Sequence, residues 1–230
     1  MIFGTFNQKK RINNLLAMLD PVHTEYLCTN ESIQSILYTM KPTPSDYFLS
    51  IMGSGQQGLS IAAKGARIDL IDNDLNQINN FSKLQEFLAN KKNSNVSCQR
   101  ILNELTVGWS AQQYFSEMNN IVNIRKNISN LKVLPPSNIQ DLKTDFSKYN
   151  KVYLSNALNY RGIDNATARN SFNIFSSQFN PGTMFYVSKE FISSADKNEQ
   201  FYVDPNLTNL ARRISNSQVQ GWSPQIIIKK

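Results

Sequence analysis

The stretch YFLSIMGSGQQGLSIAAKGARIDLIDND (residues 47–74) decides the fold class of this chain. It begins with a short apolar run, passes through three closely spaced glycines into a helix-compatible segment, and continues into a second apolar run that ends in Asp and Asn. Two strands joined by a glycine turn and a helix form the unit that builds parallel sheets with right-handed crossovers. We therefore expect strands over 47–51 and 67–71, with a helix between them over about 59–63.

Outside this stretch, apolar runs continue to alternate with helical patterns. Apolar residues at helical spacing fill the chain from about residue 76 to 130, which is longer than one crossover helix, and we interpret about 90–130 as a helical insertion. The remaining runs predict a helix over 165–179 and strands over 131–134, 151–154, 183–187 and 225–228.

These elements predict an α/β fold, with a mostly parallel twisted sheet and helices on both faces. The residues before Pro42 also have a helical pattern. We therefore expect 1–45 to form an N-terminal helical cap segment and 46–230 to form one ligand-binding domain.

Composition excludes several classes of protein. The chain has 230 residues, of which 40% are hydrophobic and 18% charged, so it can form a hydrophobic core that is stable without disulfides. Cys28 and Cys98 are the only cysteines, which excludes a disulfide scaffold. No apolar run approaches the roughly 18 residues of a spanning helix, and the N-terminus lacks a signal-peptide pattern. We expect a cytoplasmic protein.

The formal net charge of +7 bears on the partners of the protein. If the fold places the basic clusters of the chain on one face, they would allow weak contact with RNA or with an anionic membrane. If the clusters are dispersed, they only keep the protein surface hydrated. These clusters are Lys9-Lys10-Arg11, Lys91-Lys92, Arg125-Lys126, Arg212-Arg213 and Lys229-Lys230.

The three glycines predict where a ligand binds. In open α/β sheets, ligands bind at the carboxyl ends of the strands, where a glycine turn meets a helix N-terminus. Gly53, Gly55 and Gly58 have the G-x-G-x-x-G spacing, and Asp72 follows about 20 residues on, where it can accept hydrogen bonds from ribose hydroxyls. The pattern fits a nicotinamide dinucleotide or S-adenosylmethionine, and a tight turn that binds nothing is the alternative.

The sequence lacks the residues that several other common chemistries require. His23 is the only histidine, and the cysteines have no C-x-x-C spacing, so we expect no metal site. The chain has no G-x-S-x-G elbow of an α/β-hydrolase and no phosphate-binding G-x-x-x-x-G-K-[ST] loop.

The second half of the chain favours S-adenosylmethionine. The sequence FNPGTMFYVS (residues 179–188) resembles the helix–turn–strand step of class I S-adenosylmethionine-dependent transferases, which have a Rossmann-like fold. In that family the loop after the third strand touches adenine. The resemblance implies this role for Ser137, Asn138 and Ile139.

A closer resemblance emerges when four motifs are taken together. YFLSIMGSGQQGL (47–59), IDNDLNQ (71–77), VYLSNAL (152–158) and the upstream YLCTNES (26–32) are similar to motifs of the 3-amino-3-carboxypropyl transferases of betaine-lipid synthesis and their small bacterial relatives. Gly58 stands where that family has alanine, and the chain is much shorter than the full betaine-lipid enzymes. The cofactor-binding residues that we expect are Tyr26, Asn30, Glu31, Gly53, Ser54, Gly55, Gln57, Asp72, Asn73, Gln77, Asn138, Ile139 and Ser155.

The resemblance implies an S-adenosylmethionine-dependent transferase that moves an aminocarboxypropyl group to a small-molecule or lipid acceptor. Ser155, Asn156 and Tyr160 are the candidate catalytic residues, because they follow the fourth strand and would orient the acceptor. Ser50 stands where methyltransferases usually have an acidic residue for the methionine amine, and we hypothesise that Glu31 supplies that charge. The alternatives are a methyltransferase acting on a small molecule or RNA, an NAD-dependent oxidoreductase and a non-catalytic binding module.

Overall fold

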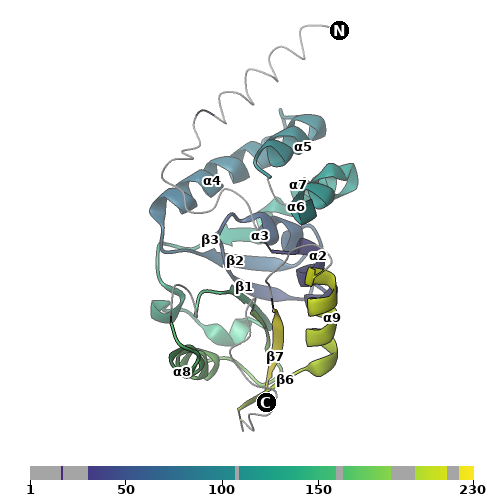
Figure 1. Ribbon diagram of the computed structural model, residues 1–230. Coiled ribbons are helices and arrows are strands. Elements are labelled where there is room, and N and C mark those ends of the chain that lie inside the picture. The colour runs from purple at the N-terminus through teal and green to yellow at the C-terminus, as the bar shows by residue number, and fades with distance from the viewer. Residues whose placement is uncertain (1–16, 18–30, 107–108, 159–162, 188–199, 217–222) are drawn as a thin grey trace, which may run out of the picture.

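The computed structural model describes residues 17, 31–106, 109–158, 163–187, 200–216 and 223–230. Its centre is a seven-stranded sheet with the order β3-β2-β1-β4-β5-β7-β6 (Figure 1). Strands β1 to β5 run parallel to their neighbours, and β7 is antiparallel to both β5 and β6. The strands are β1 (Tyr47–Ile51), β2 (Arg67–Ile71), β3 (Leu131–Val133), β4 (Lys151–Ser155), β5 (Met184–Val187), β6 (Phe201–Val203) and β7 (Gln225–Lys229).

Helices connect most of the strands. Several begin at a residue whose side chain accepts a hydrogen bond from a backbone N–H of the first turn, as Ser32, Asp74 and Asp164 do. The α-helices are α2 (Ile33–Met40), α3 (Gln56–Ala62), α4 (Leu75–Ala89), α5 (Asn95–Glu104), α6 (Trp109–Ser116), α7 (Met118–Asn127), α8 (Asn165–Ser176) and α9 (Pro205–Asn216). Single 3₁₀ turns cover Ile128–Asn130, Ile139–Asp141 and Phe146–Lys148.

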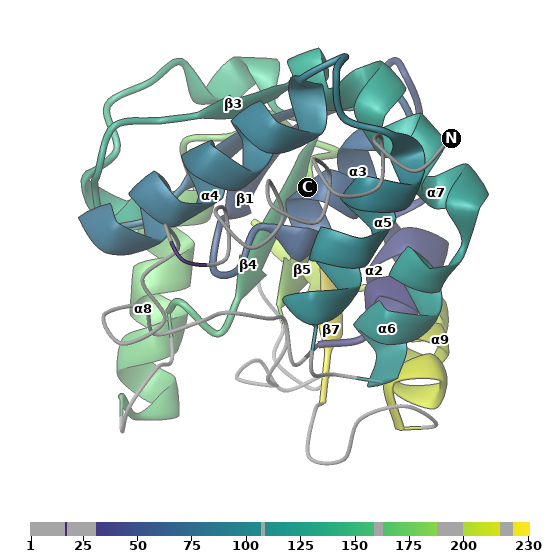
Figure 2. The same ribbon diagram turned by 90° about the horizontal axis from the view of Figure 1, so that it is seen from above.

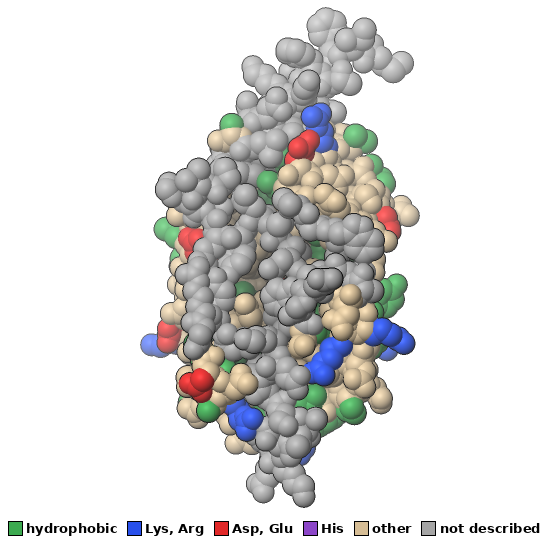
Figure 3. Space-filling model, viewed as in Figure 1, with side chains coloured by type: hydrophobic (Ala, Val, Ile, Leu, Met, Phe, Trp, Pro, Cys, Tyr) green, Lys and Arg blue, Asp and Glu red, His purple; other side chains and the backbone are tan. Residues whose placement is uncertain are grey.

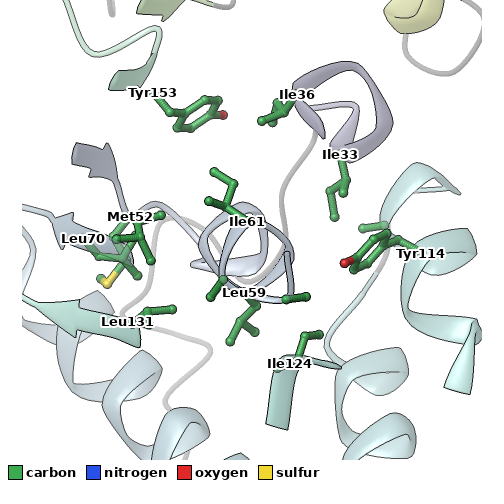
Figure 4. Packing of buried hydrophobic residues seen from close by; sticks show 14 of the residues in the cluster. Ile33, Ile36, Met52, Leu59, Ile61, Leu70, Tyr114, Ile124, Leu131 and Tyr153 are labelled. Carbon is green, nitrogen blue, oxygen red and sulfur yellow. The ribbon is translucent and has the colours of Figure 1, made fainter. Parts of the chain in front are cut away.

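Side chains that alternate along the strands build two cores, one on each face of the sheet. Phe48 of β1 joins the core under α2, α3, α4 and the α5–α7 group, whereas its neighbour Leu49 joins the core under α8. Figure 2 shows α8 well apart from α2 and α9, across the sheet. Figure 4 shows the first core, where Ile33 and Ile36 of α2 face residues of α3 and the sheet. The fold class predicted from the sequence is confirmed, with helices on both faces of a mostly parallel sheet.

Most predicted elements match the structure, and β1 and β2 have the predicted bounds. The helix predicted over 165–179 ends earlier, at Ser176, and the chain then makes a turn that places Phe179 in the second core. Neither β6 nor α9 was predicted. Helix α2, expected in a cap segment, packs on α9, α3 and α6.

The chain between β2 and β3 forms α4 followed by the compact group α5–α7. Helix α7 packs on α3, and α5 packs on both α6 and α7. Within the described ranges, no helix combines the length and the apolar character needed to cross a membrane.

Candidate functional site

The sheet order places a switch point between β1 and β4. From β1 the chain proceeds to β2 on one side, and from β3 it crosses to β4 on the other side. Open α/β sheets bind ligands in the crevice at such a point, beyond the carboxyl ends of the strands. The residues that follow β1, β2 and β4 therefore form the candidate site.

The turn after β1 is held by hydrogen bonds from three sides. The Met52 N–H donates to Ile71 O at 2.8 Å, and the Gly55 N–H donates to Met52 O at 2.6 Å. The amide Nε2 of Gln57 donates to Ile51 O at 3.2 Å and to Met52 O at 2.7 Å. Because these bonds fix the carbonyl groups of the turn, the site at the end of β1 is preorganised.

The three glycines of the motif have different roles. A Cβ on Gly55 would lie 2.0 Å from the Phe81 ring, and one on Gly58 would lie 2.8 Å from Leu70, so both glycines make room for the protein's own core. A Cβ on Gly53 would meet only Gln57 Nε2, at 3.5 Å, and Gly53 is half-buried where Gly55 is buried. Gly53, at φ 47°, is therefore the glycine that leaves backbone open to a ligand.

Asp72 connects the turn to the end of β2. Its Oδ2 accepts a hydrogen bond from the Gly53 N–H at 3.1 Å, and its Oδ1 accepts one from the Asp74 N–H at 3.0 Å. Burial raises the pKa of Asp72 above its ordinary value, although the hydrogen bonds from Asp74 and Gly53 oppose that change. The carboxylate has further lone pairs and can accept hydrogen bonds from a ribose diol.

The loop after β3 meets the end of β2 at the same place. The Ser137 N–H donates to Asp72 O at 2.9 Å, and Asn73 Nδ2 donates to Asn138 Oδ1 at 3.1 Å. Asn73 and Asn138 are exposed and available to a ligand, whereas Ile139 is buried in the second core.

A second carboxylate lies at the end of β4. Ser155 Oγ donates a hydrogen bond to Glu31 Oε1 across 124 positions of sequence. Glu31 is only 5% exposed and directly precedes Ser32, the N-cap of α2. Ser155 has a φ of 52°, and the pairing of β4 with β5 shifts register between Tyr153 and Ser155. Such left-handed residues and bulges occur at sites where a side chain must be aimed away from the strand.

The other predicted site residues differ in how deeply they are buried. Ser54, Gln57 and Gln77 are buried, and Asn156 is half-buried beside Ser155. Among the described residues, Gln57 Oε1 is a buried acceptor without a hydrogen-bond partner. Tyr26, Asn30, Tyr160 and His23 lie outside the described residues.

Some side chains of the basic clusters form hydrogen bonds within the protein. The Arg125 guanidinium donates to Leu88 O and Asn90 O, each at 3.0 Å, and Arg212 Nε donates to Pro224 O at 3.2 Å. Figure 3 shows the Lys and Arg side chains of one face at separate places, with Asp and Glu side chains among them. In the part of the chain that the structure describes, no group of His, Cys, Asp and Glu side chains could hold a metal ion.

Comparisons with known proteins found matches among solved structures only. No family model and no curated protein matches the chain. A putative methylase from Haemophilus influenzae matches 86% of this chain and 95% of its own, with a TM-score of 0.47 at 11% identity. An RNA methyltransferase from Salinibacter ruber, solved with S-adenosylhomocysteine, matches 86% of this chain and 88% of its own, with a TM-score of 0.44 at 11% identity.

PKMT2 from Rickettsia typhi gives a third match, with a TM-score of 0.39 at 14% identity. The match covers 74% of this chain, which spans only 26% of that protein. At identities this low, the likeness of all three proteins concerns the fold alone.

Sequence reasoning missed two features of the site. It did not predict that Ser155 Oγ donates a hydrogen bond to Glu31 Oε1. It also grouped Gly55 with Gly53, whereas a Cβ on Gly55 would meet the Phe81 ring. Neither the partner of a serine hydroxyl nor the ring that packs against a glycine has a signal in the sequence.

Proposed function

We propose that this protein is an S-adenosylmethionine-dependent transferase that binds its cofactor beyond the carboxyl ends of β1, β2 and β4. One observation carries the proposal. Two carboxylates follow the strands on either side of the open Gly53 turn, with Asp72 at the end of β2 and Glu31 held by Ser155 at the end of β4. S-adenosylmethionine has a ribose diol for the first carboxylate and an α-ammonium group for the second.

The residues present fit this cofactor. Gly53 leaves backbone accessible, and the buried Gln57 Oε1 beside it is an acceptor without a partner among the described residues. A nicotinamide dinucleotide would use Asp72 in the same way, but it has no amino-acid ammonium group for the buried Glu31. The pair of carboxylates therefore favours the sulfonium cofactor over NAD.

The chemistry of group transfer requires mainly positioning. The sulfonium activates its attached carbons for in-line displacement when the cofactor is bound, so the protein has to orient the acceptor and exclude water. Ser155 and Asn156, at the end of β4, are the described residues that we assign to orienting the acceptor. Tyr160 completes the predicted set.

Two reactions share this site. Attack on the methyl carbon leaves S-adenosylhomocysteine, and attack on the γ-carbon of the methionine part leaves methylthioadenosine. The motifs in residues 26–32, 47–59, 71–77 and 152–158 favour aminocarboxypropyl transfer. Methyl transfer to RNA or to a small molecule is the second candidate, and the Salinibacter ruber protein is described as an RNA methyltransferase.

Calorimetric titration with S-adenosylmethionine, S-adenosylhomocysteine, methylthioadenosine and NAD tests the cofactor. We expect micromolar binding of the sulfur nucleosides and no binding of NAD. Binding of NAD alone would overturn the assignment of S-adenosylmethionine as the cofactor. Binding of none of the four ligands would favour a non-catalytic module. Incubation of the binding-competent protein with labelled S-adenosylmethionine and candidate acceptors then separates the two reactions by the nucleoside that is released.

A further inference from the structure

One buried hydrogen-bond acceptor at the end of β1 is left without a use inside the fold. Gln57 lies in the first turn of α3 and is 3% exposed. Its amide Nε2 donates to Ile51 O at 3.2 Å and to Met52 O at 2.7 Å, whereas its Oε1 has no hydrogen-bond partner in any described part of the chain. A buried polar atom of this kind has lost its hydrogen bonds to water, so it marks a place that a ligand or an ordered water fills.

The two donated hydrogen bonds fix the orientation of the Gln57 amide. A flipped amide would place Oε1 against the carbonyl oxygens of Ile51 and Met52, and two acceptors form no hydrogen bond with each other. The same bonds tie the side chain to the turn that contains Gly53. The acceptor oxygen therefore has a defined position at the end of β1, and its chemistry as an acceptor is settled.

This amide lies on the path of the cofactor across the site. A Cβ on Gly53 would lie 3.5 Å from Gln57 Nε2, so the amide borders the open side of the turn. Strand β1 lies between β2, which is followed by Asp72, and β4, which ends at Ser155. A ligand that extends from Asp72 to the hydrogen-bonded pair of Ser155 and Glu31 has to cross the end of β1, and it passes the Gln57 amide there.

The chemistry of the acceptor selects one group of the cofactor. An amide oxygen binds only hydrogen-bond donors, and S-adenosylmethionine has three kinds: the adenine amino group, the ribose hydroxyls and the α-ammonium group. The hydroxyls are assigned to Asp72, and the adenine is expected at the loop after β3, on the far side of β2 from Gln57. The ammonium group has three N–H donors, so a carboxylate and an amide oxygen can bind it together.

We propose that Gln57 Oε1 accepts a hydrogen bond from the α-ammonium group of S-adenosylmethionine. This inference rests on the proposed function, in which Glu31 binds the same group. It makes Gln57 a specificity-determining residue that favours ligands with the amino-acid part. Two related ligands isolate the ammonium group: methylthioadenosine retains the adenosine without it, and decarboxylated S-adenosylmethionine retains it without the carboxylate.

The test compares dissociation constants measured by calorimetry on the full chain. For Gln57→Met we expect S-adenosylmethionine and decarboxylated S-adenosylmethionine to bind about tenfold more weakly relative to methylthioadenosine, as for the loss of one hydrogen bond to a charged group. Loosening of the turn weakens all three ligands together and leaves these ratios unchanged. Gln56→Met is the matched control, because it removes an adjacent buried amide whose Nε2 also donates twice, to Leu105 O and Thr106 Oγ1. We expect both ratios to stay at their wild-type values in Gln56→Met.

A spectroscopic measurement on the wild-type protein needs no substitution. A hydrogen bond to Oε1 polarises the amide group and moves the NMR resonance of Gln57 Nε2. In protein with isotope-labelled glutamine, we expect this resonance to differ between the complexes with S-adenosylmethionine and with methylthioadenosine. The complex with decarboxylated S-adenosylmethionine should resemble the first of these.

The outcomes separate this inference from the proposed function. Unchanged ratios in folded Gln57→Met, with wild-type protein that binds all three ligands, show that Oε1 faces a water or the ribose and that Gln57 only shapes the turn. That result overturns the inference and leaves the proposed function intact, and so does one Nε2 resonance shared by the complexes with S-adenosylmethionine and methylthioadenosine. A ratio that rises for S-adenosylmethionine and not for its decarboxylated form also overturns the inference, because the ammonium group is then not the group that is bound. A wild-type protein that binds none of the ligands overturns both.

Discussion

The Gly53 N–H and the Asp72 carboxylate are joined by a hydrogen bond of 3.1 Å, so the turn after β1 and the end of β2 share one acidic group. The second oxygen of Asp72 accepts from the Asp74 N–H, at the start of α4. Asp72 thereby fixes two backbone segments and still has lone pairs for a ligand. The structural role of Asp72 and the ribose-binding role proposed for it can be separated by experiment.

Replacing Asp72 with Asn should weaken the binding of every ligand that has the adenosine ribose. The amide keeps the size of the side chain but has only one acceptor oxygen. We expect S-adenosylmethionine and methylthioadenosine to lose affinity by similar factors, of about tenfold or more, because a hydrogen bond to a charged group is lost. Calorimetry on both ligands measures this, with circular dichroism to verify folding. Unchanged affinities in a folded variant would remove Asp72 from the site.

The binding of methylthioadenosine should depend on pH through Asp72. Burial raises the pKa of this carboxyl above 3.8, and hydrogen bonds from a ribose diol favour its ionised form. Affinity should therefore be constant at neutral pH and fall as the pH drops through the raised pKa. Asp72→Asn serves as the reference, because it retains only the titration of the ligand itself. A wild-type profile identical to that of the variant contradicts the assignment.

Gly55→Ala should destabilise the fold through Phe81. The new Cβ would lie 2.0 Å from the ring, at a backbone φ of 75°. We expect overpacking to lower the free energy of unfolding by about 1–3 kcal/mol. The left-handed conformation of an alanine should lower it by about 1–2 kcal/mol more. Gly182→Ala is the control, since Gly182 has a φ of 84° but no atom within 4 Å of the added Cβ. Denaturant unfolding should show a clearly larger loss for Gly55→Ala than for Gly182→Ala.

The second half of this test uses Phe81 itself. If the clash is the cause, Phe81→Ala combined with Gly55→Ala should cost less than the sum of the two single changes. Additive losses would show that the Phe81 ring does not limit residue 55.

Asp46 should stabilise the amino-terminal edge of the sheet at neutral pH. Its carboxylate accepts hydrogen bonds from Thr43 N at 2.7 Å and from Asn150 Nδ2 and Lys151 Nζ at 2.8 Å each. We expect Asp46→Asn to lower the free energy of unfolding by about 2–4 kcal/mol, because Lys151 is largely buried with it. Glu104→Gln is the control, since the Arg100–Glu104 pair is exposed and should matter by less than about 1 kcal/mol.

The same carboxylate should give the protein acid sensitivity. Burial alone would raise the pKa of Asp46, but the hydrogen bonds from Lys151, Thr43 and Asn150 outweigh it and lower the pKa. The stabilisation is therefore present above the unfolded pKa near 3.8 and is lost as the pH falls through the lower folded value. Unfolding measured against pH should show this loss in the wild type and not in Asp46→Asn.

The sequence predicts an element well where an apolar run lies between turn residues. β1 and β2 are short apolar runs between turn residues, and their bounds were predicted correctly. Helix α9 was not predicted, although Leu207, Leu210, Ala211 and Ile214 follow helical spacing, so its periodicity was present in the sequence and was overlooked. Strand β6 has only three residues, fewer than any pattern of alternation needs.

The site was predictable only in part. The glycine spacing and Asp72 place the turn, and the resemblance to a family supplies Glu31 and Ser155. The contact of Glu31 with Ser155 joins residues 124 positions apart, which no local pattern in the sequence shows. The difference between Gly53 and Gly55 depends on the position of a ring in α4, which spacing cannot show.

Ser155 is under two opposed demands. Its left-handed backbone, at φ 52°, would be less strained in a glycine residue. Glycine, however, has no hydroxyl to donate the hydrogen bond to Glu31. Ser155→Gly would relieve about 1–2 kcal/mol of backbone strain but would also take a donor from the buried Glu31 carboxylate, a loss of similar size. The residue at position 155 is therefore set by what its hydroxyl reaches as much as by the conformation of its backbone.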